Sequence, residues 1–116
     1  MGGMKRLLRA AAFSWRGITA AWRDEPAFRQ EICAAILLSA LAFWLDIGGG
    51  ARALLIGAVL LVPLVELLNT ALEAAVDLVS EERRPLAAKA KDCGSAAVFF
   101  AVVLAAAVWG TALWPN

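Results

Sequence analysis

The sequence predicts an all-α membrane protein with one amphipathic surface helix followed by three transmembrane helices. Of its 116 residues, 62% are hydrophobic, whereas a soluble domain is nearer half apolar. The mean hydropathy of +0.74 also indicates a lipid environment. Three apolar stretches approach or exceed the ~20 residues that cross a bilayer, with charged residues gathered at their ends. A chain of this length forms one domain, residues 1–116.

The composition excludes several kinds of chemistry. Histidine is absent, which removes imidazole bases and most zinc sites. The net charge of +1 gives no bulk basic character for nucleic acid. Cys33 and Cys93 lack metal-type spacing, so we expect two plain small side chains. Any acid–base chemistry must therefore fall to carboxylates, lysine or a bound metal.

Residues 4–23 predict a helix that lies in the headgroup layer, because apolar and basic side chains alternate along it. The arginines interrupt any apolar core that a signal peptide would need, so cleavage is not expected. Next, Pro26 cannot donate a backbone hydrogen bond, and it biases Glu25 away from helical angles. We therefore expect a new helix that begins at Pro26 with Glu25 as its cap.

The first span is predicted over about residues 27–46, with Trp44 placed as an interface anchor. The segment DIGGGAR, residues 46–52, is expected to form a turn, since three consecutive glycines break a helix. The second span follows over about residues 53–79. Pro63 within it removes one backbone hydrogen bond and is expected to kink the helix before Glu66.

The third span is predicted over about residues 87–114, of which residues 94–114 carry no charge. Basic residues set the orientation of all three spans. Ten of them gather before the first and third spans: Lys5, Arg6, Arg9, Arg16, Arg23, Arg29, Arg83, Arg84, Lys89 and Lys91. Arg52 alone lies on the opposite side. The positive-inside rule then places the N-terminus in the cytoplasm and the C-terminus in the periplasm.

The second span carries an unusual polar stripe. On a helix that turns about 100° per residue, Glu66, Asn69, Glu73 and Asp77 fall within roughly 80° of one another. We call these four residues the polar seam. Because each such group costs a few kcal/mol or more in hydrocarbon, an ionisable seam in a span indicates function.

Further charged groups are expected at the cytoplasmic end of the seam. Lys91, Asp92 and Ser95 begin the third span, and Glu25 lies at the same membrane level. Carboxylates there can hold Mg²⁺, arginines and lysine can bind a polyphosphate, and the deep Glu66 can accept a proton from a lipid hydroxyl. The residues thus permit phosphoryl transfer to a membrane alcohol, but they equally permit helix–helix hydrogen bonding or proton conduction.

Several stretches, in order along the chain, carry a resemblance to a known family: FSWRGITAAWRDEPAFRQE, WLD, ELLNTALEAAVD, AKDCGSAAV and ALW. With them the chain resembles the small integral-membrane diacylglycerol kinases of bacteria. The resemblance implies ATP-dependent phosphorylation of 1,2-diacylglycerol to phosphatidic acid, with Mg²⁺, in the inner membrane. It also implies a homotrimer with composite sites between subunits, in agreement with the need to cover a polar seam.

The resemblance also implies residue roles. Glu66 matches the general base, Glu25 and Glu73 match the metal ligands, and Asn69 and Asp77 support them. The positions implied for ATP are Arg6, Phe13, Glu25, Glu73, Glu82, Arg83, Arg84, Lys91 and Asp92. The positions implied for the lipid substrate are Arg6, Trp15, Trp22, Arg29, Glu31, Trp44, Arg52, Glu66, Ser95 and Trp109.

The chain departs from the family pattern at three positions. Phe13 stands where a tyrosine is usual, Arg84 where a histidine can occur, and Pro63 where a flexible apolar residue is usual. Undecaprenol kinases share the seam motif and three spans, so an undecaprenol kinase remains an alternative. FRQE, WLD and KDCGSAAV favour the diacylglycerol branch, whereas NTA leans slightly the other way. A non-enzymatic membrane oligomer with the same seam is a more distant alternative.

Overall fold

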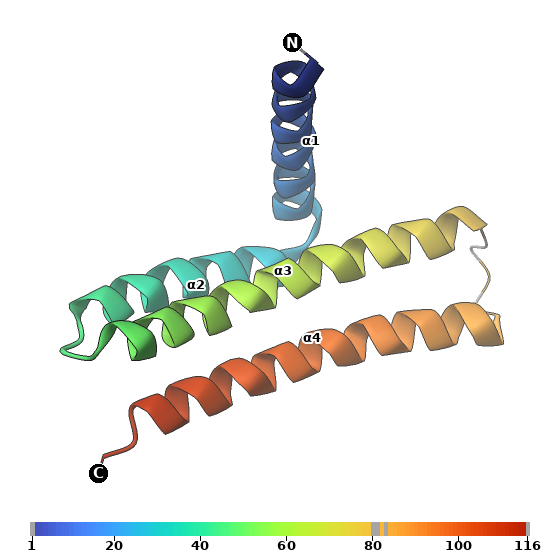
Figure 1. Ribbon diagram of the computed structural model, residues 1–116. Helices are drawn as coiled ribbons and strands as arrows, with labels where there is room; N and C mark the ends of the chain where they lie inside the picture. Colours follow the sequence, from blue (N-terminus) through green and yellow to red (C-terminus); the bar gives the residue numbers. More distant parts are fainter. Residues whose placement is uncertain (1, 80–81, 83, 116) are drawn as a thin grey trace.

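The computed structural model describes residues 2–79, 82 and 84–115, and within these ranges all regular structure is helical. Four helices follow one another: α1 (Gly2–Asp24), α2 (Pro26–Trp44), α3 (Gly49–Val79) and α4 (Pro85–Ala112). Figure 1 shows that α2, α3 and α4 run side by side, whereas α1 stands away from them. The predicted all-α class and the order of its elements are confirmed.

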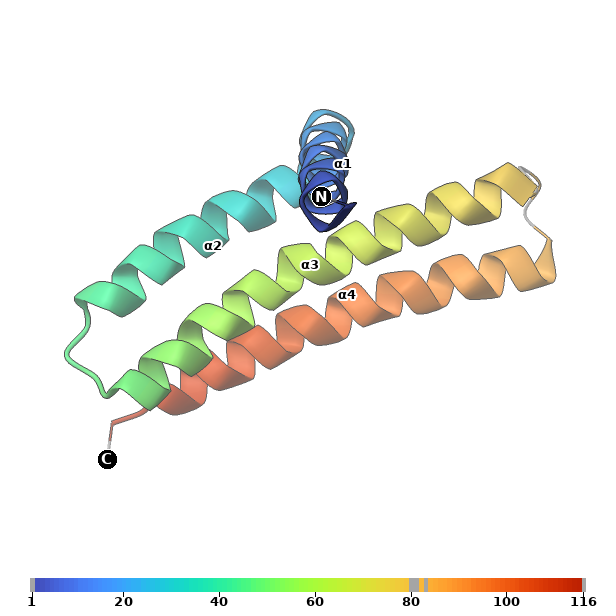
Figure 2. The same cartoon turned by 45° about the horizontal axis from the view of Figure 1, so that its top comes forward.

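Helix α3 is the centre of the fold. It packs against α4 along one side and against α2 along the other, while α2 and α4 do not meet within the described residues. The three helices therefore form an open layer rather than a closed bundle, as the turned view in Figure 2 also shows. Helix α1 contacts α2 and α3 only near its own C-terminal end, where Ala21 is buried.

The core of a single chain is thin, and it consists mainly of small or branched side chains. The fully buried large side chains are Phe28 of α2 and Leu55 of α3. Most other large apolar side chains are exposed, although α2, α3 and α4 are each long and apolar enough to cross a membrane. A hydrogen-bonded helix with an apolar surface is stable in lipid, so these exposed faces fit a bilayer or a neighbouring subunit.

The connection between α2 and α3 is shorter than the sequence indicated. The turn predicted over residues 46–52 is wrong in its second half, because Gly49 and Gly50 already belong to α3. The Arg52 backbone N–H donates to the carbonyl of Gly48 at 3.0 Å, which closes the first helical turn there. Glycine is tolerated at this place, since the first N–H groups of a helix have no partner inside the helix. Pro63 lies inside α3 without interrupting it.

The side chain of Arg52 joins both helices at this turn. Its guanidinium donates to the carbonyl oxygens of Ala42 at 2.9 Å, Leu45 at 2.9 Å and Ile47 at 3.2 Å. The last carbonyls of a helix have no partner inside the helix, so Arg52 satisfies groups that lipid could not. Nearby, the Trp109 indole N–H donates to the carbonyl of Leu55 at 3.0 Å and ties α4 to α3.

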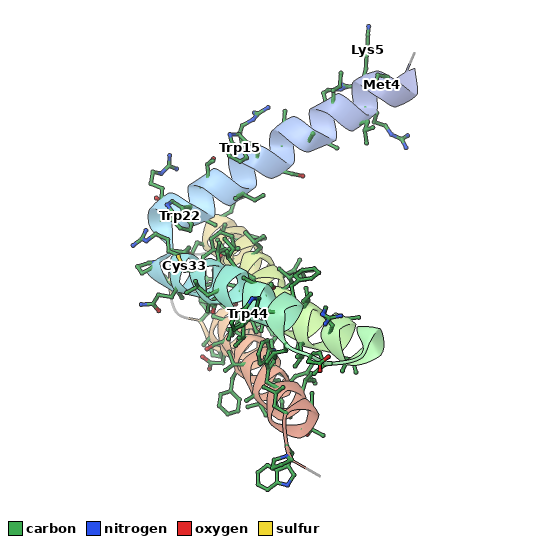
Figure 3. All side chains as sticks on the ribbon, turned by 90° about the vertical axis from the view of Figure 1, so that its left-hand side faces the viewer. Met4, Lys5, Trp15, Trp22, Cys33 and Trp44 are labelled. Atoms are coloured by element: carbon green, nitrogen blue, oxygen red, sulfur yellow. The ribbon has the colours of Figure 1, made fainter. Side chains whose placement is uncertain are left out.

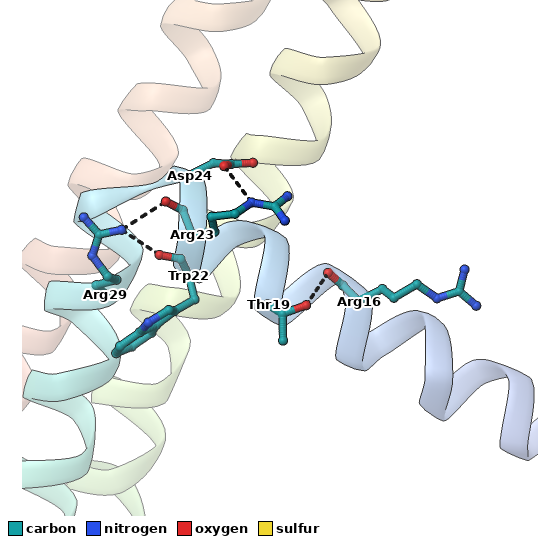
Figure 4. A network of polar contacts seen from close by, with 6 residues as sticks. All are labelled: Arg16, Thr19, Trp22, Arg23, Asp24 and Arg29. Atoms are coloured by element: carbon teal, nitrogen blue, oxygen red, sulfur yellow. Dashed lines mark hydrogen bonds and ion pairs between the residues drawn. The ribbon is translucent and has the colours of Figure 1, made fainter.

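The junction between α1 and α2 has a similar tie. One guanidinium nitrogen of Arg29 donates to the carbonyls of Trp22 at 2.7 Å and Arg23 at 3.2 Å, at the end of α1 (Figure 4). Glu25 is the N-cap of α2 and Pro26 follows it, as predicted, but the Glu25 side chain makes no capping hydrogen bond. Its carboxylate is therefore not committed to the helix that it precedes.

Replacement of Arg52 by alanine separates a structural role from the lipid contact that the resemblance implies. Because hydrogen bonds from a charged donor contribute more than neutral ones, we expect Arg52→Ala to lower the free energy of unfolding by about 2 kcal/mol. The measurement is thermal unfolding in detergent, with Arg9→Ala on the exposed face of α1 as the control. Unchanged stability together with a raised KM for lipid would contradict the structural role.

Candidate active site

The polar seam lies along α3 as its spacing predicts. Glu66 is the deepest member, and among the described residues it is the one buried charged side chain, with 8% of its surface exposed. Asn69 and Glu73 are half-buried, and Asp77 is exposed. Exposure thus increases from Glu66 towards the α3–α4 connection, so the seam leads from the interior of the layer to its edge.

Two members of the seam are bonded to each other. The Asn69 side-chain amide donates to the Glu73 carboxylate at 2.8 Å, one helical turn along α3. This hydrogen bond restrains the Glu73 carboxylate and occupies only one of its two oxygens. The Asn69 amide oxygen is buried and accepts no hydrogen bond from the described part of the chain.

Helix α4 joins the seam at its exposed end. The Lys91 ammonium pairs with the Asp77 carboxylate at 2.5 Å, with both side chains partly exposed. Arg84 and Glu82 form an exposed ion pair at 3.6 Å in the connection before α4, and Asp92 follows Lys91 on the surface. Arg83, which the resemblance assigns to ATP, lies outside the described residues. The Lys91 ammonium therefore lies at the exposed end of the seam beside Asp77, which we call the mouth of the seam.

Carboxylates from three places in the chain converge on Glu66. Glu25 at the α1–α2 junction and Glu73 on α3 both lie close enough to repel its charge, and so does Glu31 on α2. One oxygen of Glu31 is buried and accepts no hydrogen bond within the described chain. An unneutralised group of this kind is costly at membrane depth. The arrangement therefore fits a ligand that brings positive charge or hydrogen-bond donors.

The acidic groups suit Mg²⁺ only if the ion is shared with a substrate. Among the described residues, no three acidic or thiol groups are close enough to hold a metal by themselves. Mg²⁺ in phosphoryl-transfer sites is held by one or two carboxylates together with substrate phosphates and water. Glu73, held by Asn69, and Glu25, without a capping bond, provide such a pair.

A groove of about 310 Å³ opens between α2, α3 and α4 beside these carboxylates. Gln30 and Glu31 line its polar end. The remaining lining is apolar and comes from all three helices: Ala34, Ala35, Leu38, Val59, Val62, Val102 and Ala105. A groove with one polar end and an apolar body suits an amphipathic ligand whose head lies near Glu31. Sequence reasoning missed this groove, because its walls come from separate helices.

Other predicted site residues are not brought together in one chain. Arg6, Phe13 and Trp15 lie on the exposed length of α1, which projects away from the layer in Figure 3. The Phe13 ring lies 4.8 Å from the Arg16 guanidinium rather than near the seam. Trp44 ends α2, far along that helix from Glu31, and Ser95 is exposed on α4. These placements leave their implied contacts as predictions.

Three predicted lipid-contact residues make hydrogen bonds within the chain, and a fourth lies at the end of α1. Arg29 bonds the last carbonyls of α1, and Arg52 bonds carbonyls at the α2–α3 turn. Trp109 donates to α3, and Trp22 lies in the last turn of α1. In one chain, therefore, only Glu31 and Glu66 of the implied lipid residues lie beside each other in the interior of the layer.

Comparisons with known proteins agree with this site. A family model described as prokaryotic diacylglycerol kinase matches residues 12–113. A Pseudomonas aeruginosa protein named diacylglycerol kinase is 50% identical over 111 residues, which cover 96% of this chain and 90% of the relative. The protein of that name from Escherichia coli strain K12 is 47% identical over 114 residues, covering 98% and 93%. That from Helicobacter pylori strain J99 is 39% identical over 108 residues, covering 93% and 84%.

The comparisons confirm the resemblance that the motifs carried, and they favour it over both alternatives. The three relatives share the name diacylglycerol kinase, and none of them is named an undecaprenol kinase or a structural membrane protein. The matched residues include the polar seam, Glu25, Glu31 and the start of α4. The chain therefore belongs to the prokaryotic diacylglycerol kinase family and is a lipid kinase of the membrane.

Proposed function

We propose that this kinase transfers the γ-phosphoryl group of Mg-ATP to the free hydroxyl of 1,2-diacylglycerol and releases phosphatidic acid and ADP. The observation that carries the proposal is the buried Glu66 carboxylate, with Glu25, Glu31 and Glu73 near enough to repel its charge. The apolar groove adjoins this group through Glu31. A lipid alcohol in the groove and a nucleotide at the mouth of the seam would meet at Glu66.

Glu66 acts as the general base in this proposal. Its carboxylate takes the proton of the lipid hydroxyl as the hydroxyl oxygen attacks the γ-phosphorus. A new P–O bond forms in line, the bond to the bridging oxygen breaks, and ADP leaves with the electron pair. Burial supports this role, because a carboxylate shielded from water is not occupied by solvent hydrogen bonds. Glu31 would orient the lipid head group by accepting a hydrogen bond from it.

Glu25 and Glu73 hold the Mg²⁺ of the nucleotide in this proposal. When bound, the ion supplies charge neutralisation on the phosphate oxygens. Asn69 supports Glu73 through their hydrogen bond. Lys91 is held by Asp77 at the seam mouth and would bind phosphate oxygens there. Asp92, Glu82, Arg83 and Arg84 would complete the nucleotide site.

The active unit is proposed to be a homotrimer with sites shared between subunits. Two observations support this: large apolar faces of α2 and α4 are exposed in one chain, and α1 carries Arg6 and Phe13 away from the layer. A neighbouring chain would cover those faces and bring its own α1 to the seam. Phe13 would then offer a ring without a hydroxyl. The distribution of basic residues supports an N-terminus in the cytoplasm, where ATP is available, and a C-terminus in the periplasm.

The product identifies the substrate. We expect the purified protein in mixed micelles, given Mg-ATP with diacylglycerol and undecaprenol side by side, to form phosphatidic acid as the main product. Undecaprenyl phosphate as the main product would retain the chemistry but contradict the choice of lipid. A folded oligomer that phosphorylates neither alcohol would contradict the proposed function.

The Glu66→Gln substitution tests the general base. Glutamine keeps the size of the side chain but cannot accept the proton, so we expect kcat to fall by at least about 100-fold. Subunit assembly should persist and the thermal midpoint should not fall, since a buried neutral amide costs less than a carboxylate. A kcat near the original value would exclude Glu66 as the base.

The Glu73→Gln substitution tests the metal–nucleotide carboxylate. We expect the Mg²⁺ concentration for half-maximal rate to rise by at least about 100-fold, because loss of a ligand costs no less than loss of a ligand's supporting partner. Excess Mg²⁺ should restore part of the rate, because the change weakens binding rather than proton transfer. Asp46→Asn, which removes an exposed carboxylate near the α2–α3 turn, is the matched control. An unchanged Mg²⁺ requirement would refute this role for Glu73.

A further inference from the structure

Of the nine glycines in the chain, Gly94 is the one that is buried. It lies in α4 and, with Ala101, is one of the buried residues of that helix. Glycine is less favourable than alanine inside a helix, because it loses more backbone freedom and adds no side-chain contact. A glycine at a buried helical position therefore indicates a close approach of another group.

The close approach is to Asn69 of the polar seam. A Cβ atom placed on Gly94 would overlap the Asn69 amide oxygen, and it would lie 2.9 Å from Leu72 Cδ2 and 3.2 Å from Asn69 Cγ. Every other glycine of the chain has open space within 4 Å of the same position: Gly2, Gly3, Gly17, Gly48, Gly49, Gly50, Gly57 and Gly110. Gly94 is thus the place where the α4 backbone lies directly on a seam side chain.

This contact selects one orientation of the Asn69 amide. A Gly94 Cα hydrogen occupies the direction in which the Cβ would stand, and it therefore faces the buried Asn69 oxygen. That oxygen accepts no conventional hydrogen bond within the described residues, and a Cα–H group is a weak donor suited to it. With the oxygen turned to α4, the amide nitrogen is left to donate to Glu73. If the Asn69 amide were flipped, its N–H₂ group would face the Gly94 Cα–H group, and the hydrogen bond to Glu73 would be lost.

The surroundings leave little freedom to relieve an added Cβ. Leu72 is flexible and can turn aside, but the α4 backbone is held one turn away by the Lys91–Asp77 ion pair. The Trp109–Leu55 hydrogen bond holds the same two helices further along. An added methyl group would therefore displace the Asn69 amide rather than the helix.

We propose that Gly94 is a positioning residue for the lipid kinase reaction: without a Cβ, it lets α4 lie on the Asn69 amide and keeps that amide bonded to Glu73. The inference rests on the proposed role of Glu73 as a metal–nucleotide carboxylate. Gly94 itself contacts neither the phosphate nor the lipid. Its effect passes through Asn69 to the carboxylate that shares Mg²⁺ with ATP.

The test compares Gly94→Ala with Gly110→Ala, which adds the same methyl group to the same helix in open space. We expect Gly94→Ala to raise the Mg²⁺ concentration for half-maximal rate about tenfold, as loss of a ligand's supporting partner does. The KM for diacylglycerol should stay unchanged, and Gly110→Ala should match the unaltered enzyme. A merely structural glycine would lower the active fraction without moving the Mg²⁺ requirement, and that result would overturn the inference.

A second measurement covers the case in which Gly94→Ala folds poorly. Thermal midpoints are compared for Gly94→Ala, Asn69→Ala and the double variant, because residues in contact show non-additive effects. If the methyl group acts on Asn69, Gly94→Ala lowers the midpoint of the unaltered protein but not that of Asn69→Ala. Equal losses in both backgrounds would overturn the inference. Absence of lipid phosphorylation by the unaltered protein and Gly110→Ala alike would instead overturn the proposed function.

Discussion

The fold depends on keeping the Glu66 carboxylate inside an apolar layer. Lipid cannot solvate this group, so the chain must surround it with protein, and α3 has to be the central helix. Helix α2 covers it from one side, and the α1–α2 junction brings Glu25 near it. The break in the chain at Pro26 matters for the same reason: a straight helix through this point would leave the Glu25 carboxylate on its own helical face instead of at the seam.

The open layer follows from the same constraint. A closed bundle of α2, α3 and α4 would seal Glu66 among repelling carboxylates, with no route for a nucleotide or a lipid. In the observed arrangement α2 and α4 stay apart, and the groove between them reaches Glu31. The layer is therefore thin, with few large side chains fully buried. An open layer of this kind suits the proposed site, which would admit one substrate from water and another from lipid, but it leaves only a small core within one chain.

The sequence predicted what depends on local patterns. Hydropathy located the three spans, Pro26 located the start of α2, and the helical period placed Glu66, Asn69, Glu73 and Asp77 on one face. It could not predict what depends on how two helices are placed against each other. The carbonyls that Arg52 bonds belong to the end of α2 and to the connection after it, and the contact of Gly94 with Asn69 joins residues of separate spans. The run of glycines predicted a break in the helix, because glycine content does not reveal that the Gly48 carbonyl accepts the Arg52 N–H and that Gly49 and Gly50 therefore lie in the first turn of α3.

The relative placement of α3 and α4 has an identifiable physical origin. Polar ties join the two helices near both ends: Trp109 to Leu55 at one, and Lys91 to Asp77 at the other. They are about 33 Å apart along α3, so a slip of one turn, about 5.4 Å, would break both together. Because lipid supplies no hydrophobic force between helices, these polar ties act together with van der Waals packing of the facing side chains. The two ties are thus consistent with the register in which Gly94 lies opposite Asn69, the residue that donates to the Glu73 carboxylate.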